Sequence, residues 1–338
     1  MGKEGLVVDC DSHVMEPPEL WQEYLEPRFR DRAIRIEERD GVEHLVIGEQ
    51  VVLSGVLFPT IGILPFPTDD DALASAYCRA YNRWQAQFAA ALPGRVLPVA
   101  IVNWRDPGEA VRELGRCLDL GFRGLFVPSE TIDGRRPDDP VHDELWARLA
   151  EAGVPGLLHV IVRFGGAAVP FADWHATGPG PVFGFGLGAT AQLIPAISAM
   201  VVTGLFDRHP TLKIGAVEAG CGFAAYLMDR VDEKHRVFAS TMSLAHRPSD
   251  YFRCNLWFVA EPEERGIGAA LELVGEDRIL WGSDFPHIDA PPDAPDRIRR
   301  AVAELTPERR RRVLGENARV LFGDRKSTRL NSSHYRTS

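Results

Sequence analysis

Short apolar runs rich in branched residues alternate along the chain with longer segments of helical periodicity. This alternation is typical of a parallel sheet flanked by helices. Eight strands are predicted, at residues 6–11, 51–58, 95–102, 121–127, 154–159, 212–218, 255–259 and 278–284. Eight strand–helix units with no evident linker predict an α/β fold, a (β/α)8 barrel of the TIM type.

The segments between the strands predict the helices. They lie at residues 69–91, 107–120, 139–152, 190–206 and 222–236, and two closing helices reach residue 322. Between the first two strands only a short helical pattern at 19–24 and a hairpin pattern around Asp40-Gly41 are present. We therefore assign residues 14–50 to a polar insertion that contains a hairpin.

A segment rich in glycine and proline forms a second insertion, at residues 161–189. A loop of this length is expected to be functional, because barrel enzymes build their substrate pockets on the strand-to-helix side. The residues from Asp324 onward are polar and aperiodic, and they match the translation of a common sequencing-library adapter. The prediction is one barrel domain at 1–323 and a non-native tail at 324–338.

Composition narrows the function classes. The formal net charge is −10, from 48 acidic and 38 basic residues, which argues against a nucleic-acid partner. Mean hydropathy is −0.13, and neither a membrane-length apolar run nor a signal region is seen, so we expect a cytoplasmic protein without a membrane partner. The five cysteines are scattered and are expected to be reduced. No glycine-rich nucleotide motif follows the first strand.

Candidate chemistry begins at the end of the first strand, in the run Asp9-Cys-Asp-Ser-His13. Because side chains alternate faces in a strand, Asp9, Asp11 and His13 share one side. A carboxylate and an imidazole two residues apart can hold one divalent ion. Asp9 is better explained as structural, which leaves Asp11 and His13 as the predicted ligand pair. Alone, this short pattern is a weak signal.

Three later strands also end in side chains that can bind a metal. His159 ends the fifth predicted strand, Glu218 the sixth and Asp284 the eighth. Taken singly, His159 is explained as a core histidine and Asp284 as a helix N-cap. Together with the first-strand pair they predict a site for one divalent metal ion, with open positions for water or substrate.

These residues resemble a known group, the amidohydrolase superfamily. The resemblance is to the amidohydrolase-related branch that contains aminocarboxymuconate-semialdehyde decarboxylase and the resorcylate decarboxylases. It spans most of residues 6–322 and is carried by the runs Val8–His13, Phe58–Gly62, Leu212–Glu218 and Leu280–His287, and by His159. It implies an enzyme that holds one divalent ion, Zn or Mn, and acts on a small molecule; it also allows a homodimer.

The resemblance assigns roles to individual positions. The usual pair of first-strand histidines falls on Asp11 and His13, the fifth-strand ligand on His159 and the eighth-strand aspartate on Asp284. The sixth-strand position, usually a histidine, is Glu218 here. Its carboxylate could bind the metal, hydrogen-bond the metal's water, or pair with Arg230 in the following helix.

Four further residues are weaker candidates. His287 could hydrogen-bond the substrate or Asp284, or serve the loop structurally. Arg163 and His175, in the second insertion, could bind a substrate carboxylate, although a surface position explains either of them better when it is taken singly. Arg123 could pair with a carboxylate inside the barrel, and we include it among the predicted substrate-binding residues.

Two reactions fit such a site. In a non-oxidative decarboxylation, the metal orients a small aromatic or unsaturated carboxylic acid, and an acid such as Asp284 protonates carbon as carbon dioxide leaves. In a hydrolysis of an ester, lactone or amide, the metal activates a water and Asp284 carries its proton to the leaving group. The acidic first ligand and the resemblance favour decarboxylation. A third hypothesis is a non-catalytic, metal-free barrel.

Overall fold

The computed structural model describes residues 7–14, 16–17, 19–32, 35–39, 42–47, 50–52, 68–92, 96–160, 188–285, 287 and 290–323. Its centre is a six-stranded parallel sheet in which each strand pairs with the next one along the chain. The strands are β4 (Val99–Ala100), β5 (Gly124–Pro128), β6 (Gly156–His159), β7 (Ile214–Ala216), β8 (Leu256–Ala260) and β9 (Ile279–Trp281). They correspond to the third to eighth predicted strands, and all but β8 are shorter than the predicted run.

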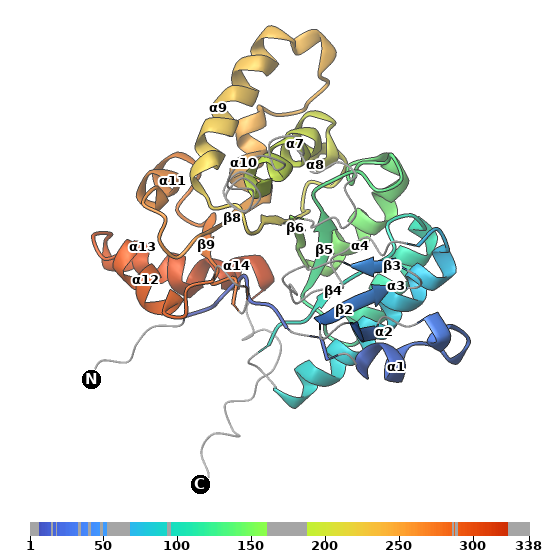
Figure 1. The fold of residues 1–338 in the computed structure, drawn as a ribbon. Coiled ribbons are helices and arrows are strands. Elements are labelled where there is room, and N and C mark those ends of the chain that lie inside the picture. The colour runs from blue at the N-terminus through green and yellow to red at the C-terminus, as the bar shows by residue number, and fades with distance from the viewer. Residues whose placement is uncertain are drawn as a thin grey trace.

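Helices follow the strands and lie outside them (Figure 1). Between β4 and β9 these are α3 (Pro107–Asp119), α4 (Asp143–Ala152), α7 (Ala189–Val202), α8 (Leu205–Arg208), α9 (Gly222–Val237), α10 (Pro248–Asn255) and α11 (Ile267–Leu273). The long helix α2 (Asp71–Ala91) precedes β4, as predicted. The predicted helix 190–206 is broken between α7 and α8, where Gly204 has a φ of 72°. The helices α10 and α11 were not predicted.

The chain closes with α12 (Ala294–Ala301), α13 (Pro307–Arg311) and α14 (Asn317–Phe322). A π-helical turn at Arg312–Glu316 joins the last two. Among the described residues, no helix combines the length and the apolar character needed to cross a membrane.

The predicted first strand lies beside β9. The backbone N–H of Cys10 donates to the carbonyl of Trp281 at 3.0 Å, and that of His13 donates to Phe285 at 2.8 Å. An isolated parallel bridge joins Ser12 to Phe285. The first segment therefore extends the parallel sheet past its last strand, as closure of a barrel requires.

The segment between the first strand and α2 differs from the prediction in one respect. The short helix α1 (Glu19–Tyr24) is confirmed, and β1 (Arg35–Arg39) pairs antiparallel with β2 (Val42–Ile47) around the predicted turn. The start of the predicted second strand is instead β3 (Gln50–Val52), which pairs antiparallel with β2. Because Ile47 pairs with Gln50 and Leu45 with Val52, these residues join the hairpin. Residues 53–67 lie outside the described residues.

The core follows the alternation of side chains along the strands. Leu157, Val259 and Leu280 pack in one cluster with Ala318 and Leu321 of α14. The residues beside them in sequence face the opposite way and pack in the largest cluster, under the surrounding helices; these are Leu158, Phe258 and Ile279. The strands are therefore buried on both faces, which explains why they are apolar throughout.

Candidate metal centre

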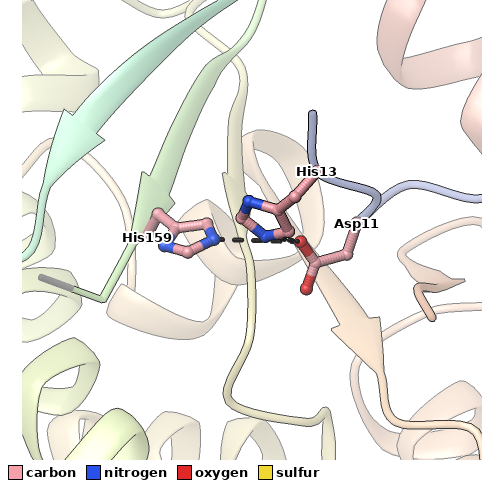
Figure 2. A group of neighbouring side chains, drawn as sticks. All are labelled: Asp11, His13 and His159. Carbon is pink, nitrogen blue, oxygen red and sulfur yellow. Dashed lines mark ion pairs between the residues drawn. The ribbon is translucent and has the colours of Figure 1, made fainter. Parts of the chain in front are cut away.

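The Asp11–His13 pair lies at the carboxyl end of the sheet, where the first segment passes β9. The Nε2 atom of His13 is 3.2 Å from Oδ1 of Asp11 and 3.2 Å from Oδ1 of Asp284. Figure 2 shows the side chains of Asp11, His13 and His159 converging from two different segments. The alternation of faces that predicted the pair is therefore present in the structure.

His159 is the last residue of β6 and is buried. Its Nδ1 atom lies 2.9 Å from the carbonyl oxygen of Val160. A carbonyl only accepts, so Nδ1 carries a proton, and Nε2 is the ring nitrogen that faces the cluster, as in histidines that bind metals. Nε2 is 3.8 Å from Oδ1 of Asp11 and 3.2 Å from Oε2 of Glu218.

Asp284 follows β9 by three residues and is also buried. Its backbone N–H donates to the carbonyl of Asp11 at 2.7 Å, which fixes the two carboxylate-bearing segments against each other. Its Oδ1 atom is 2.5 Å from Nδ1 of His287. The predicted contact between His287 and Asp284 is therefore present, and it occurs inside a buried cluster.

Glu218 lies two residues beyond β7, with a φ of 57°. Asp284 has the same φ. Left-handed backbone costs about 1 to 3 kcal/mol for a residue other than glycine, and such residues concentrate at functional sites. Arg230 is one of the three partners predicted for Glu218. It bonds instead to Glu233, one turn further along α9. The Glu218 carboxylate contacts His159 and thus belongs to the cluster.

Asp9 joins the segment that carries Asp11 to the loop that carries Asp284. Its Oδ1 atom accepts the backbone N–H of Asp11 at 3.1 Å and that of Ser283 at 2.9 Å. The segments approach so closely that a Cβ at Gly282 would lie 2.2 Å from the Cβ of Asp11. Only glycine fits there. The sequence identified Asp9 as structural but gave no sign that its partner is the loop after β9.

The pKa shifts in the cluster reflect several carboxylates buried close together beside the two histidines. Burial alone would raise the pKa of Asp11, but the imidazoles of His13 and His159 outweigh it and hold that pKa well below its usual value. Burial would lower the pKa of His13, but Asp11 and Asp284 raise it to about 10. Burial, with Asp284 and Asp11 nearby, raises the pKa of Glu218 well above its usual value. A proton on His13 therefore balances the carboxylates when no cation is bound.

The donor set and its spacing fit one divalent ion. Nitrogen and oxygen ligands about 2.1 Å from one ion lie roughly 3 to 3.5 Å from each other, close to the separations around His13 and His159. Among the described residues, Nε2 of His159 and Oδ1 of Asp284 are buried and make no hydrogen bond of normal geometry. Two groups of ligand-capable atoms share His13, one with Asp11 and His159 and one with Asp284 and His287.

Of the three predicted substrate-binding residues, Arg123 lies among the described residues, and it lies away from this cluster. Arg123 immediately precedes β5, at the amino end of the strand, and its backbone N–H donates to Pro98. The cluster lies at the carboxyl ends, roughly 15 Å away along a strand of this length, so the position of Arg123 gives no support for a substrate contact. Arg163 and His175 lie outside the described residues.

A family model described as amidohydrolase, Amidohydro_2, matches residues 8–323. A γ-resorcylate decarboxylase from Polaromonas sp. is 28% identical over 297 residues, covering 85% of this chain and 83% of the relative. The crystal structure of an amidohydrolase from Mycobacterium avium subsp. paratuberculosis has a TM-score of 0.79 at 23% identity, covering 94% of this chain and 99% of the other.

A second solved structure comes from the branch to which the sequence is similar. It is a dihydroxybenzoic acid decarboxylase from Polaromonas sp. with bound manganese and the inhibitor 2-nitroresorcinol. Its TM-score is 0.63 at 26% identity, and the match covers 77% of this chain and 78% of the other. The predicted barrel fold and the predicted branch are both confirmed by these matches. The chain belongs to the amidohydrolase family.

Proposed function

We propose that this protein catalyses the non-oxidative decarboxylation of a small aromatic carboxylic acid at the cluster around His13. The observation that carries the proposal is the convergence of Asp11, His13, His159 and Asp284 at one end of the parallel sheet. An acidic residue stands in the first ligand position. The relatives named above are resorcylate and dihydroxybenzoic acid decarboxylases, which supports a hydroxylated benzoate as the substrate class.

Asp11, His13, His159 and Asp284 would hold one divalent ion. Manganese is favoured over zinc by the manganese bound in the Polaromonas decarboxylase, and the nitrogen and oxygen donors suit either ion. Such an ion supplies positive charge that orients a carboxylate and a neighbouring hydroxyl oxygen.

The chain's own residues supply the proton. Asp284, whose Oδ1 is 2.5 Å from His287, donates it to the ring carbon that bears the carboxylate. The bond to the carboxylate carbon then breaks, its electron pair restores the aromatic ring, and carbon dioxide leaves. No oxidant or reductant is required. Glu218, beside His159, is the second group placed to hold a proton next to the substrate.

The direct test is product analysis with defined metal content. Protein stripped of metal and reloaded with Mn²⁺ is incubated with γ-resorcylate, and carbon dioxide and resorcinol are measured. We expect both products in equal amounts, and their loss on chelation. His159→Ala should lower the rate by at least about a hundredfold, because it removes a ligand.

A matched control variant distinguishes an effect on the site from a general effect of replacing a histidine. His235→Ala changes a half-exposed histidine near the C-terminal end of α9, whereas Glu218 precedes the start of that helix. This variant should leave the rate unchanged. Turnover of an ester, lactone or amide without carbon dioxide would assign the protein to the hydrolases instead. A protein that binds no metal and is indifferent to both chelator and His159→Ala would contradict both reactions.

A further inference from the structure

The loop that carries Glu218 is held by a carboxylate from the next strand's loop. Glu264 lies between β8 and α11, 46 positions after Glu218 in the chain. Its Oε2 atom accepts the backbone N–H of Cys221 at 2.9 Å, and its Oε1 atom accepts that of Gly222 at 2.6 Å. These N–H groups begin α9, a helix of 16 residues whose N-cap residue makes no side-chain cap bond.

The same carboxylate also closes its own turn. The N–H of Glu261, the first residue after β8, donates to Oε2 of Glu264 at 3.3 Å, and the N–H of Glu264 donates to the carbonyl of Glu261 at 3.1 Å. A negative charge at a helix N-terminus is favourable, because the first N–H groups have no partner within the helix. Glu264 thus ties the loop after β7 to the loop after β8.

Two glycines make room for this carboxylate. A Cβ at Gly220 would lie 3.0 Å from Oε2 of Glu264, and a Cβ at Gly222 would lie 2.9 Å from Oε1. Gly220 also has a φ of 68°, in the left-handed region. The run Glu218-Ala-Gly-Cys-Gly222 is therefore shaped to receive the Glu264 side chain.

We infer that Glu264 is a positioning residue for Glu218. Glu218 is held in a left-handed conformation at φ 57°, which surrounding structure must impose. Within the described residues, the bonds to Cys221 and Gly222 anchor the chain three and four positions after Glu218. They fix the loop so that the Glu218 carboxylate stays 3.2 Å from Nε2 of His159. The inference rests on the proposed role of Glu218 at the site.

A double-mutant cycle tests this dependence. Glu218→Ala, Glu264→Ala and the double variant are compared with the wild type in kcat/KM for γ-resorcylate and in the dissociation constant for Mn²⁺. We expect Glu264→Ala to lower kcat/KM by about tenfold, because small displacements at a site are costly. If Glu264 acts through Glu218, the double variant should match Glu218→Ala within about threefold. Losses that multiply would overturn the inference, as would an unchanged Glu264→Ala.

Two further variants guard against simple unfolding. Glu264→Gln keeps an acceptor oxygen and should recover part of the loss, whereas Gly222→Ala displaces the carboxylate from the other side and should reproduce the loss. Thermal unfolding is measured for each. Glu263→Ala is the matched control, because its side chain is 69% exposed and pairs only with Arg297 on α12 among the described residues.

The Mn²⁺ measurements separate this inference from the proposed function. If the wild type releases no carbon dioxide, the proposed reaction is wrong, and the cycle is judged on Mn²⁺ affinity alone. Weaker Mn²⁺ binding in Glu264→Ala that disappears in the Glu218→Ala background would still support positioning through Glu218. Equal Mn²⁺ affinity in every variant, with no turnover, would overturn it.

Discussion

At the residue scale, the centre depends on how closely two backbone segments approach. Oδ1 of Asp11 and Oδ1 of Asp284 each lie 3.2 Å from Nε2 of His13, although the aspartates are far apart in the chain. Gly282 allows that approach, and Asp9 holds it with two backbone hydrogen bonds. The geometry of the proposed ligands therefore depends on Gly282 and Asp9, which are not among them, as is usual for metal sites.

The side chain of Asp9 gives the first prediction. Asp9→Ala should weaken Mn²⁺ binding by about ten- to a hundredfold, because the backbones that carry Asp11 and Asp284 lose their shared acceptor. Asp9→Asn keeps an acceptor oxygen and should weaken binding less. Competition with a fluorescent chelator measures both dissociation constants. Asp119→Ala, at the exposed last residue of α3, is the control. Equal affinity in Asp9→Ala and the control would contradict the prediction.

At the element scale, an ion-pair network attaches α2 to its neighbours. Arg79 on α2 contacts Glu26, which follows α1, at 2.7 Å and Glu109 on α3 at 2.7 Å. All three side chains are at most 27% exposed, so solvent screens the pairs only in part. Hydrogen bonding from Arg79 outweighs burial and lowers the pKa of Glu26; for Glu109, burial opposes the arginines but its pKa is lowered too.

These shifts predict a pH-dependent contribution to stability. A carboxyl whose pKa is lower in the folded protein stabilises it above the unfolded pKa, and this stabilisation is lost as the pH falls through the folded value. Arg79→Met should therefore lower the free energy of unfolding by about 1 kcal/mol at pH 7, with a smaller difference below pH 4. Urea unfolding at both pH values measures it. Arg112→Met, at a side chain 62% exposed, should have a smaller effect. A difference that grows in acid would contradict the explanation.

At the scale of the whole molecule, the centre brings together three segments that lie far apart in the sequence. The proposed ligands come from the first segment beside β9, from the end of β6 and from the loop after β9. Barrel enzymes place their active sites at the carboxyl ends of the strands, where the loops of successive units meet. The single-domain assignment at 1–323 and the homodimer stay predictions.

Because the ligands are this far apart in sequence, metal binding should stabilise the whole fold. A ligand at about a hundred times its dissociation constant adds about 2.7 kcal/mol. We expect Mn²⁺ to raise the Tm of the metal-free protein by several degrees, as measured by scanning calorimetry. His159→Ala should show a much smaller rise. An equal rise in the two proteins would place the stabilising ion elsewhere.

The sequence was sufficient for the order of the six parallel strands. Apolar runs buried on both faces predicted six parallel strands in the correct order. His159 and Asp284 were predicted because each stands where such a run stops. The helices α10 and α11 were missed, and residues 51–52 belong to β3 in the hairpin rather than to a barrel strand. A short branched run is compatible with either a barrel strand or a hairpin strand, and only its partner decides.

Sequence by itself determined which side chains the strand ends present, because strand periodicity and apolar runs are local properties of the chain. Tertiary structure alone decided that Asp9 bonds to Ser283, that Glu218 contacts His159 rather than Arg230, and that Glu264 receives the N–H groups of α9. It also placed Arg123 at the wrong end of its strand for the site. These contacts join residues that the chain separates widely, and their distances depend on how the sheet closes.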